Sequence, residues 1–309
     1  NIFIKSFPYY HFKFSNFTAR STAMEITEHY GLSIRDFIAN ALKEDVGDGD
    51  HTSLSTIPES EHGIANVKVK ENGIIAGLAL ADQILNQVDS GLIVKVHVAE
   101  GSAVKPGDIV MTVEGKVRSL LTAERLLLNC MQRMSGIATL TNKYVEAIKG
   151  TSTKILDTRK TTPNFRIFEK WAVQLGGGNN HRFGLYDMIL IKDNHVDAAG
   201  GIKNAIERAN EYILKVGKKL KIEIETRSLE EVNQVLSIGK VDRIMLDNFS
   251  PALLKEAIKL IDKKFETEAS GGITLDTIRS FAESGVDFIS VGALTHSHKS
   301  LDISMKIVK

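Results

Sequence analysis

Cysteine is nearly missing from this 309-residue sequence, which contains Cys130 alone. A single cysteine excludes a disulfide-stapled scaffold and a cysteine-clustered zinc site. Charge of one sign is not in excess either, since 39 Lys and Arg balance 38 Asp and Glu. This balance argues against a general nucleic-acid binder and against a polybasic membrane-surface protein. The longest apolar runs, such as residues 126–128, are far shorter than the roughly 20 residues that cross a bilayer. We therefore expect a cytoplasmic globular protein.

Aromatic residues are also scarce, at 6% of the chain, and many of them lie near the amino terminus. Residues 1–23 carry Lys5, Lys13 and Arg20 but no acidic residue. They lack the apolar core and the cleavage site of a secretory signal. We interpret residues 1–23 as a disordered or vector-derived extension before a native start at Met24. At roughly 150 residues per domain, the remaining length suits two domains.

The first half of the chain begins with apolar residues at helical spacing, which predict a helix over residues 34–42. The acidic, glycine-broken stretch 44–50 then has Asp at alternating positions, as calcium loops do. The bidentate Glu required at the twelfth position is absent, because counting from Asp45 leads to Thr56. We favour a solvated turn in which Asp side chains cap backbone amides.

Short strands are predicted next, over residues 64–69, 73–76, 92–98 and 109–113. The turn-rich stretch 98–108 between the last two resembles biotinyl and lipoyl carrier domains. Such a carrier needs a modifiable Lys at a hairpin tip in an acidic or Met-flanked context, which this sequence does not offer. We therefore interpret the likeness as structural, with carrier function as an alternative.

A long helical region is predicted over residues 118–148, with a break at Ser135 and Gly136 that splits it in two. Arg125 lies among leucines in the first part, a pattern that is typical of a surface arginine. Cys130 is expected to be a small buried apolar residue, because no Cys/His pattern surrounds it.

After Gly150 the pattern changes to strands separated by helical segments, which is typical of parallel β/α units. The predicted strands cover residues 154–156, 188–191, 221–225, 243–246, 265–269 and 288–291. Ligands bind at the carboxyl ends of strands in barrels and in open parallel sheets. Polar or glycine-rich groups follow all six predicted strands, so the sequence predicts an active site at these ends.

The residues at these ends suit an anionic substrate. Cationic side chains there are Arg159, Lys160, His181, Arg182 and Lys192. Arg offers a fork for carboxylate or phosphate, and Lys a compact point charge. Glu225 and Asp247 are hard oxygen ligands of the kind that Mg²⁺ accepts. The loops 270–272 and 292–293 suit a terminal phosphate.

Several of these residues have alternative interpretations. Glu223 shares a strand face with Glu225, so either carboxylate could instead be held in a structural ion pair. His195 and His296 are each compatible with a ligand contact or with a structural hydrogen bond. Gly176, with the two glycines after it, could be a mere flexible loop.

Seven motifs now identify a family that the chain resembles. They are LTAER at 121–125, DTRKT at 157–161, NHR at 180–182, IKDNH at 191–195, LDNF at 246–249, SGG at 270–272 and VGALTHS at 291–297. In this order they resemble quinolinate phosphoribosyltransferase, also called nicotinate-nucleotide pyrophosphorylase (carboxylating). The resemblance runs from about Met24 to the carboxyl terminus.

The resemblance implies a fold and an assembly. It implies an N-terminal α+β sandwich-like domain at residues 24–129, completed by residues 295–309. An incomplete α/β barrel of about seven strands follows at residues 130–294. It also implies a homodimer in which Arg125 reaches the neighbouring subunit's site, with neither nucleic acid nor membrane as a partner.

The resemblance further implies a reaction and its residues. Quinolinate and phosphoribosyl pyrophosphate give nicotinate mononucleotide, pyrophosphate and CO₂, a step of NAD biosynthesis. Lys160, Lys192, Glu225 and Asp247 would be catalytic, and the two acids would also hold Mg²⁺, partly through the substrate. The implied substrate ligands are Arg125, Thr158, Arg159, Lys160, His181, Arg182, Lys192, Glu225, Asp247, Ser270, Gly271, Gly272, Val291, Gly292, Ala293 and His296.

Two other enzymes remain as alternatives. A nicotinate phosphoribosyltransferase or the molybdenum-associated homologue would share the scaffold. Nicotinate lacks the second carboxylate, however, so its site should need fewer cations than this sequence provides. The other alternative is a Schiff-base aldolase that uses Lys192.

Overall fold

The computed structural model describes residues 33–308 of the chain, so the predicted extension at residues 1–23 lies outside the described residues. These residues form two compact units. The first comprises residues 33–140, Thr162–Gly176 and 298–308, and the second comprises Thr141–Thr161 and Gly177–Ser297. The domain limits 24–129 and 130–294 stay a prediction, and the sequence did not indicate that Thr162–Gly176 joins the first unit. No helix within residues 33–308 is both long and apolar enough to span a membrane.

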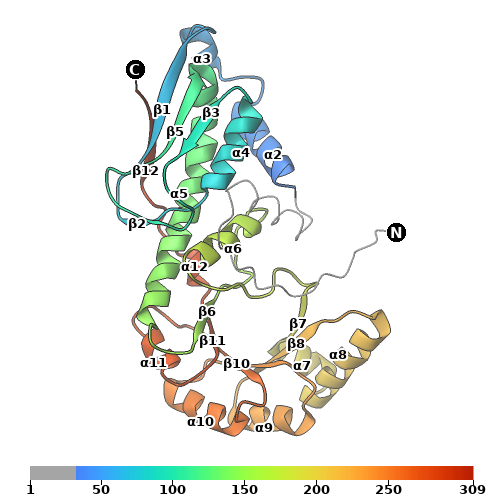
Figure 1. Ribbon diagram of the computed structural model, residues 1–309. Coiled ribbons are helices and arrows are strands. Elements are labelled where there is room, and N and C mark those ends of the chain that lie inside the picture. The colour runs from blue at the N-terminus through green and yellow to red at the C-terminus, as the bar shows by residue number, and fades with distance from the viewer. Residues whose placement is uncertain (1–32, 309) are drawn as a thin grey trace. The chain divides into compact units, whose positions relative to one another are not determined.

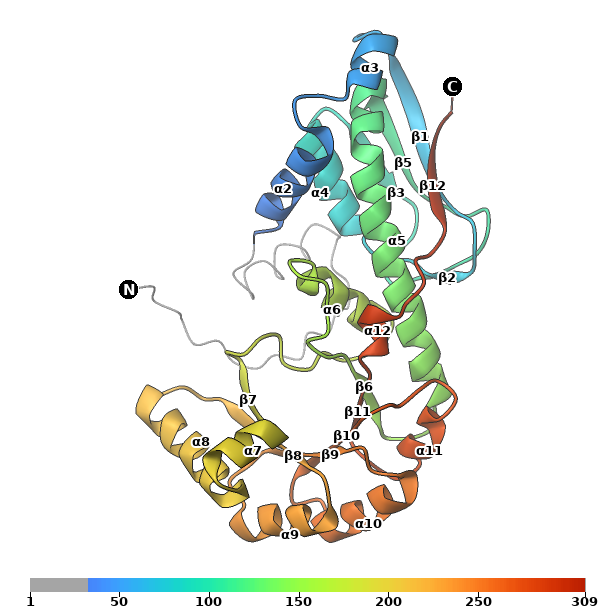
Figure 2. The same ribbon diagram turned by 180° about the vertical axis from the view of Figure 1, so that it is seen from behind.

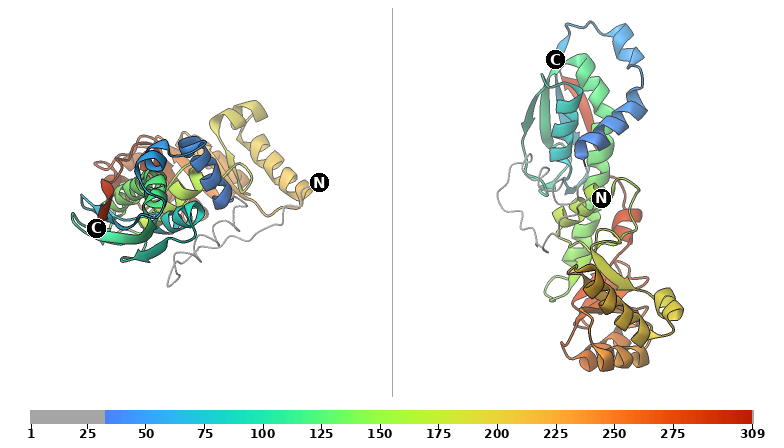
Figure 3. Two further views of the ribbon diagram at one scale, coloured as in Figure 1. Left: turned by 90° about the horizontal axis from the view of Figure 1, so that it is seen from above. Right: turned by 90° about the vertical axis from the view of Figure 1, so that its right-hand side faces the viewer.

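The first unit contains an antiparallel sheet of four strands in the order β12-β1-β5-β3. The strands are β1 (His62–Val69), β3 (Ile93–Val96), β5 (Ile109–Lys116) and β12 (Ile303–Val308). β12 pairs with β1 along its whole length, so the last strand of the described chain lies beside the first in one sheet (Figure 3). β2 (Gly73–Ile74) and β4 (Ala103–Val104) form a separate ladder. The strands predicted between residues 64 and 113 are all present, although their ends differ.

Helices cover one face of this sheet. α4 (Leu78–Val88) and the first part of α5 (Val117–Ala147) lie on the same side (Figures 1 and 2). α2 (Ile34–Val46), α3 (His51–Thr56) and α6 (Arg166–Leu175) complete the helices of the first unit that the structure describes. Together with the antiparallel sheet they confirm the predicted α+β class.

The acidic stretch before α3 is a helix cap. The Asp50 carboxylate accepts a hydrogen bond from Ser53 N at 3.0 Å, as an N-cap residue does. The interpretation of residues 44–50 as a turn with a capping Asp is confirmed for residues 47–50 only, because α2 continues through Val46 instead of ending near residue 42. Cys130 is buried on α5, also as expected.

The break predicted in the long helix is wrong, because α5 is continuous from Val117 to Ala147. The Ser135 hydroxyl donates to Ala76 O and accepts from Ala76 N. A Cβ on Gly136 would clash with the carbonyl oxygen of Lys299. The serine and glycine therefore allow other segments of the first unit to approach the helix closely, and they do not end it.

The second unit contains a six-stranded parallel sheet in the order β6-β11-β10-β9-β8-β7. Its strands are β6 (Lys154–Leu156), β7 (Met188–Ile191), β8 (Lys221–Thr226), β9 (Arg243–Asp247), β10 (Glu266–Ser270) and β11 (Phe288–Ser290). Each of the six predicted strands is confirmed to within one residue at either end.

The helices of the second unit follow its strands. They are α7 (Asp193–Ala199), α8 (Ile202–Val216), α9 (Leu229–Ile238), α10 (Pro251–Ile261), α11 (Ile278–Ala282) and α12 (Ala293–His296). α8, α9 and α10 lie on the outer side of the curved sheet (Figures 1 and 2). The Ser228 hydroxyl accepts from Glu231 N and caps the start of α9.

A seventh segment extends this sheet beyond β6. Asn179 forms a parallel bridge with Leu156, and its N–H donates to Ile155 O at 2.8 Å. The sheet order of the described residues ends at β7 on the other side, so the barrel is not closed there. Six strands and one bridge thus give the predicted incomplete α/β barrel.

Candidate active site

The carboxyl ends of the parallel strands form a rim of polar side chains in the second unit. Lys192 follows β7, Glu225 lies near the end of β8, and Asp247 ends β9. β8 and β9 are neighbours in the sheet, which places the two carboxylates on adjacent strands. Burial and the Asp247 charge together raise the pKa of Glu225, while Lys192 lowers it. Two carboxylates that repel each other beside a lysine form a site for a cation and its anionic ligand.

A pair of guanidinium groups lies in the same unit. Burial first, and then the charge of Arg159, lower the pKa of Arg182. The Arg182 guanidinium donates from Nη1 to Met188 O at 3.1 Å, which fixes its direction. Two guanidinium groups close enough to repel each other favour an anion with more than one negative charge.

Glycines keep two of the strand-end loops compact. Gly271, after β10, has a φ of +104°, and a Cβ there would clash with Asn248. After β11, a Cβ on Gly292 would lie 3.0 Å from both Lys160 Cδ and His296 Nε2. These approaches bring backbone N–H groups, Lys160 and His296 together, as the binding of a phosphate requires.

Lys160 is also held through its backbone. Thr295 donates from its hydroxyl to Lys160 O at 2.7 Å, and Lys160 N donates to Thr158 Oγ1 at 3.0 Å. Thr158 thus contributes a turn within the motif. Because the main chain at Lys160 is fixed at both ends, its exposed side chain starts from a defined position.

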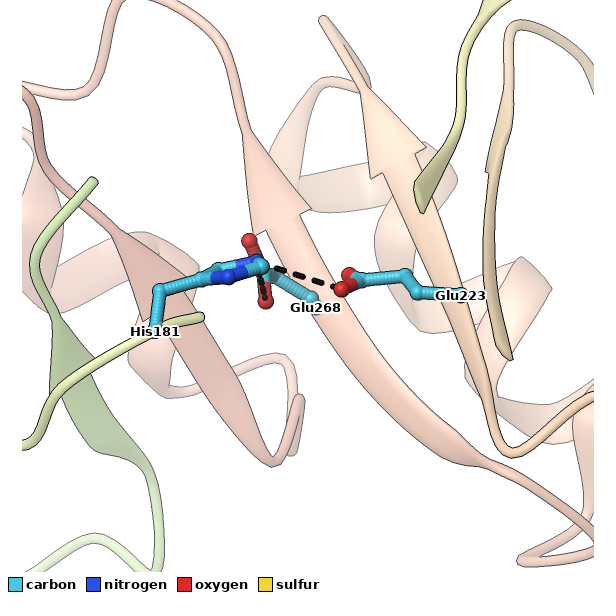
Figure 4. A group of neighbouring side chains, drawn as sticks. All are labelled: His181, Glu223 and Glu268. Carbon is cyan, nitrogen blue, oxygen red and sulfur yellow. Dashed lines mark ion pairs between the residues drawn. The ribbon is translucent and has the colours of Figure 1, made fainter. Parts of the chain in front are cut away.

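Below the rim, four charged side chains form what we call the floor cluster: His181, Glu223, Arg243 and Glu268. The last three lie on β8, β9 and β10, and His181 follows the Asn179 bridge. The His181 Nε2 atom is 3.1 Å from Glu223 Oε2 and 3.4 Å from Glu268 Oε2 (Figure 4). Arg243 Nη1 is 2.9 Å from Glu268 Oε2 and 3.9 Å from Glu223 Oε2. Both glutamates are fully buried. Each floor carboxylate therefore has cationic partners in the protein itself.

The protonation of the floor cluster follows from these contacts. Burial alone lowers the pKa of His181, but the charges of Glu268 and Glu223 outweigh burial and raise it to about 10. The Arg182 N–H points at His181 Nδ1 at 2.7 Å, a bond that exists only while Nδ1 is unprotonated. The two carboxylates thus favour the doubly protonated ring, whereas the amide hydrogen, which the backbone fixes, favours the neutral ring with its proton on Nε2. We assign the neutral form to this arrangement, because a proton on Nδ1 would clash with the Arg182 N–H. Burial and the neighbouring Glu268 raise the pKa of Glu223, whereas His181 and Arg243 lower that of Glu268 despite its burial.

The floor cluster is also the group of residues that could hold a transition metal. His181, Glu223 and Glu268 offer ligand atoms that lie within 4.8 Å of one another. The Arg243 guanidinium already contacts both carboxylates, however, so a bound cation would have to compete with it. On the rim, Lys192 acts on Glu225 through its charge, but among residues 33–308 no ion pair is found for Glu225 or Asp247, so these two carboxylates suit Mg²⁺ better.

The structure thus brings most of the predicted site residues onto one unit. The Val291 side chain is buried, and the Val291 N–H donates to Leu156 O. Neither group is therefore available to a ligand at residues 291–293. Ala293 begins α12. His195 accepts from Lys192 N through Nδ1 at 2.9 Å, which favours the structural interpretation of this histidine. Arg125 is exposed on the part of α5 that belongs to the first unit.

Three residues of the floor cluster were not singled out as site residues from the sequence: Glu223, Arg243 and Glu268. The ion pair considered for Glu223 is confirmed. Charged residues inside strands that are otherwise apolar were the available signal, because strands of parallel sheets are normally buried on both faces. Asp157, in a recognised motif, proves to accept the His181 N–H at 2.8 Å.

Comparison with known proteins places the chain in a family. Residues 50–135 match the N-terminal domain and residues 137–306 the C-terminal domain of quinolinate phosphoribosyl transferase. The chloroplastic nicotinate-nucleotide pyrophosphorylase [carboxylating] of Arabidopsis thaliana is 46% identical over 94% of this chain and 89% of its own. The probable nicotinate-nucleotide pyrophosphorylase [carboxylating] of Bacillus subtilis is 41% identical over 89% and 94%. The crystal structure of NadC from Streptococcus pyogenes shares 40% identity and a TM-score of 0.85, covering 89% of this chain and 97% of that one. The chain belongs to the quinolinate phosphoribosyltransferase family.

Proposed function

We propose that this protein transfers the phosphoribosyl group of phosphoribosyl pyrophosphate to quinolinate, with decarboxylation, to give nicotinate mononucleotide, pyrophosphate and CO₂. The observation that carries the proposal is the composition of one rim. Two guanidinium groups that repel each other, two carboxylates on adjacent strands and two glycine loops lie in a single unit. The names of the relatives given above support the same reaction.

Quinolinate is a pyridine with two adjacent carboxylates, and the cations of this chain suit it. Arg159, Arg182 and Lys192 would bind the two carboxylates, with His181 close behind Arg182. The repulsion that lowers the pKa of Arg182 is relieved when a dianion lies between the two guanidinium groups. A monocarboxylate would relieve it only in part, which favours quinolinate over nicotinate.

The cofactor that we propose is Mg²⁺, held by Glu225 and Asp247 and partly by substrate oxygens. The fit rests on the donor set, since both ligands are hard carboxylates and their mutual repulsion raises the pKa of Glu225. When bound, Mg²⁺ supplies positive charge to the pyrophosphate. The same two carboxylates would also accept hydrogen bonds from the ribose hydroxyls.

The remaining residues would bind the phosphates of phosphoribosyl pyrophosphate. Ser270, Gly271 and Gly272 would donate backbone N–H groups to the 5′-phosphate, together with the loop of Val291, Gly292 and Ala293 and with His296. Lys160, which approaches Gly292 and His296, would face the pyrophosphate, and Thr158 supports the turn before it.

Catalysis would rest on orientation and charge. The C1–O bond to pyrophosphate breaks, negative charge grows on the leaving group beside Lys160, and positive charge grows on the ribose beside the rim carboxylates. The pyridine nitrogen forms the new bond to C1. The cationic ring then accepts the electron pair of the breaking C–CO₂ bond, and that carbon takes up a proton as CO₂ leaves. Lys192 and the arginines would hold the ring in line for this sequence.

We also propose a homodimer in which Arg125 completes the site of the partner subunit. Arg125 is exposed on α5 and lies in the first unit, whereas the rim lies in the second. Arg125→Ala and Lys192→Ala proteins should each be nearly inactive. Mixing them after partial unfolding should restore activity, because some mixed dimers contain one site with both residues intact. No recovery in verified mixed dimers would argue against a shared site.

The proposed location is the cytoplasm. Curated relatives from plants are named chloroplastic or mitochondrial, so the location of this chain needs its own measurement. Tagging of the full-length protein in its source cell tests the proposal directly. Signal confined to an organelle would contradict it.

An assay with defined substrates tests the proposed reaction. The protein is incubated with phosphoribosyl pyrophosphate and Mg²⁺ and either quinolinate or nicotinate, and nicotinate mononucleotide and CO₂ are measured. We expect both products with quinolinate and little product with nicotinate. Preference for nicotinate would indicate the nicotinate enzyme instead. A mass increase after borohydride treatment with a sugar phosphate would indicate the aldolase, and a biotinylated or lipoylated mass the carrier.

A further inference from the structure

We propose that Glu268 is a positioning residue: through His181, its buried carboxylate fixes the peptide that carries the substrate-binding Arg182. The inference rests on the proposed function, because it assigns a purpose to Arg182 in that reaction. It extends the site to a residue on β10 that lies below the rim. Three sets of contacts within the second unit connect Glu268 to Arg182.

The first step is the fixation of the peptide between residues 181 and 182. His181 N donates to the buried Asp157 carboxylate at 2.8 Å. Arg182 N donates to Nδ1 of the His181 ring at 2.7 Å. The Arg182 guanidinium donates to Met188 O at 3.1 Å. Arg182 is thus held at its backbone by the imidazole and at its side chain by a strand of the sheet.

The second step is the fixation of the imidazole. One ring nitrogen, Nδ1, accepts from Arg182, so the ring orientation decides where this peptide lies. The other nitrogen, Nε2, faces Glu223 and Glu268 at 3.1 and 3.4 Å (Figure 4). A histidine whose Nε2 proton faces a carboxylate has its tautomer and its ring plane set by that carboxylate. With Nε2 protonated, Nδ1 is kept free to accept the Arg182 N–H.

The third step is the fixation of the carboxylate. Glu268 accepts from Arg243 Nη1 at 2.9 Å, and its pKa is lowered by His181, Arg243 and a hydrogen bond from Ser290. Glu223 is contacted by Arg243 at 3.9 Å only. Glu268 is therefore the more firmly held of the two carboxylates, and it stays charged beside the imidazole.

The neighbouring Glu266 provides a natural control. It lies two residues earlier on β10 and also accepts from Arg243, at 3.1 Å from Nη2. Glu266 also pairs with Lys221 at 3.4 Å, and no ion pair between Glu266 and His181 is found among the described residues. Glu266 and Glu268 therefore share Arg243, and the contact with His181 distinguishes them.

The expected consequence concerns the binding of quinolinate. A guanidinium that is displaced or mobile loses bidentate contact with a carboxylate, whereas the loops after β10 and β11 would bind the phosphates of the other substrate through backbone N–H groups. Loss of such support commonly costs about ten- to hundredfold in affinity or rate. We expect the cost to appear in the KM for quinolinate and much less in the KM for phosphoribosyl pyrophosphate.

The test compares Glu268→Gln with Glu266→Gln in the full-length protein. Steady-state kinetics are measured with each substrate varied in turn. For Glu268→Gln, we expect a rise of about tenfold or more in the KM for quinolinate and a change of less than about twofold for phosphoribosyl pyrophosphate. For Glu266→Gln, both constants should stay close to those of the unchanged protein. Equal effects of the two substitutions would overturn the proposal, because they would indicate general loosening of the floor.

A double-mutant cycle tests whether Glu268 acts through His181. If it does, adding Glu268→Gln to a His181→Ala protein should change the KM for quinolinate very little further. Independent, multiplicative effects of the two substitutions would overturn the proposal. So would stoichiometric metal on the purified protein, lost in Glu268→Gln, since the floor cluster would then be a metal site.

Glu268→Gln could leave Arg243 without enough partners and prevent folding. In that case Glu268→Gln is combined with Arg243→Met, which removes both charges together. The double variant should fold and still show the raised KM for quinolinate, and a normal KM would overturn the proposal. The proposed function fails separately, if the unchanged protein does not turn over quinolinate at all. The positioning role fails if the unchanged protein is active and the Glu268 variants match it.

Discussion

Glu223 and Glu225 are two residues apart on β8 and share a face of the same strand, yet their surroundings are opposite. Glu223 belongs to the floor cluster, where His181 and Arg243 contact the carboxylates. Glu225 belongs to the rim, where Asp247 repels it and raises its pKa together with burial. The floor carboxylates have ion-pair partners within the protein, whereas no ion pair is found for Glu225 or Asp247 among the described residues. We infer that the rim residues bind ligands and that the floor residues hold the sheet rigid.

The largest effect is expected when the floor loses its buried cation. Arg243→Met leaves Glu223 and Glu268 with His181 alone, and breaking a buried ion pair from one side costs about 3–5 kcal/mol. Unfolding in urea, followed by circular dichroism, measures this loss. Arg243→Met with Glu268→Gln should recover part of the stability, because one carboxylate charge is removed with its partner. If Arg243→Met were as stable as the original protein, the floor cluster would not be a stabilising network.

On the rim, Glu225→Gln should affect turnover and leave the fold intact. Loss of a group that stabilises charge in the transition state costs about a hundred- to thousandfold in kcat. The KM for quinolinate should move much less, and the Mg²⁺ dependence of the rate should weaken. Stability should stay equal or rise slightly, because the repulsion with Asp247 is relieved. Equal losses in kcat and in quinolinate affinity would count against the metal role, and a large loss of stability would contradict the contrast with the floor.

A third carboxylate lacks both the cationic partners of the floor and the ligand expected at the rim. Glu100, in the first unit, accepts from Gly77 N and Ala79 N at the start of α4. Burial raises its pKa from 4.5 to about 7, even though these backbone hydrogen bonds oppose the rise. Between pH 4.5 and 7 the folded state therefore binds more protons at this site than the unfolded state does.

Stability that depends on Glu100 should accordingly be present below pH 4.5 and be lost as the pH rises through 7. A shift of this size corresponds to at most about 3 kcal/mol in the free energy of unfolding. The change should be smaller than that, because the residue as a whole is only half-buried. Urea unfolding at several pH values between 5 and 8, for the original protein and for Glu100→Gln, measures it. The glutamine variant should lack this part of the pH dependence. Parallel pH profiles for the two proteins would refute the assignment.

Much of the second unit was predictable from sequence, for a physical reason. Its strands are short apolar runs that end in polar groups, so strand limits and rim residues are encoded in the same local pattern. Lys192, Glu225 and Asp247 were identified in this way. The floor cluster was not, because its pairs join residues on β8, β9 and β10 with a histidine from a seventh segment. Which charges meet depends on the order of strands, and a strand pattern alone does not contain that order.

The first unit shows the same limit in its helices. α4 has no side-chain cap of its own, because Glu100 caps it from a later loop, so no local pattern marks its start. At Ser135 and Gly136 the local rule predicted a break that the structure does not contain. Packing against residues 76 and 299 explains both small residues. At each of these positions tertiary contacts, and not local propensity, determine the structure.

The pairing of β12 with β1 has a consequence for the order of synthesis. Every residue of the second unit precedes residue 298, so a ribosome delivers all of that unit before β12 emerges. The first unit is begun earlier but can add its last strand only afterwards, when residues 303–308 are free to pair with β1. Until then a nascent chain carries one side of β1 unpaired, an edge that can join other strands. The unit whose synthesis starts first is therefore the one whose folding ends last.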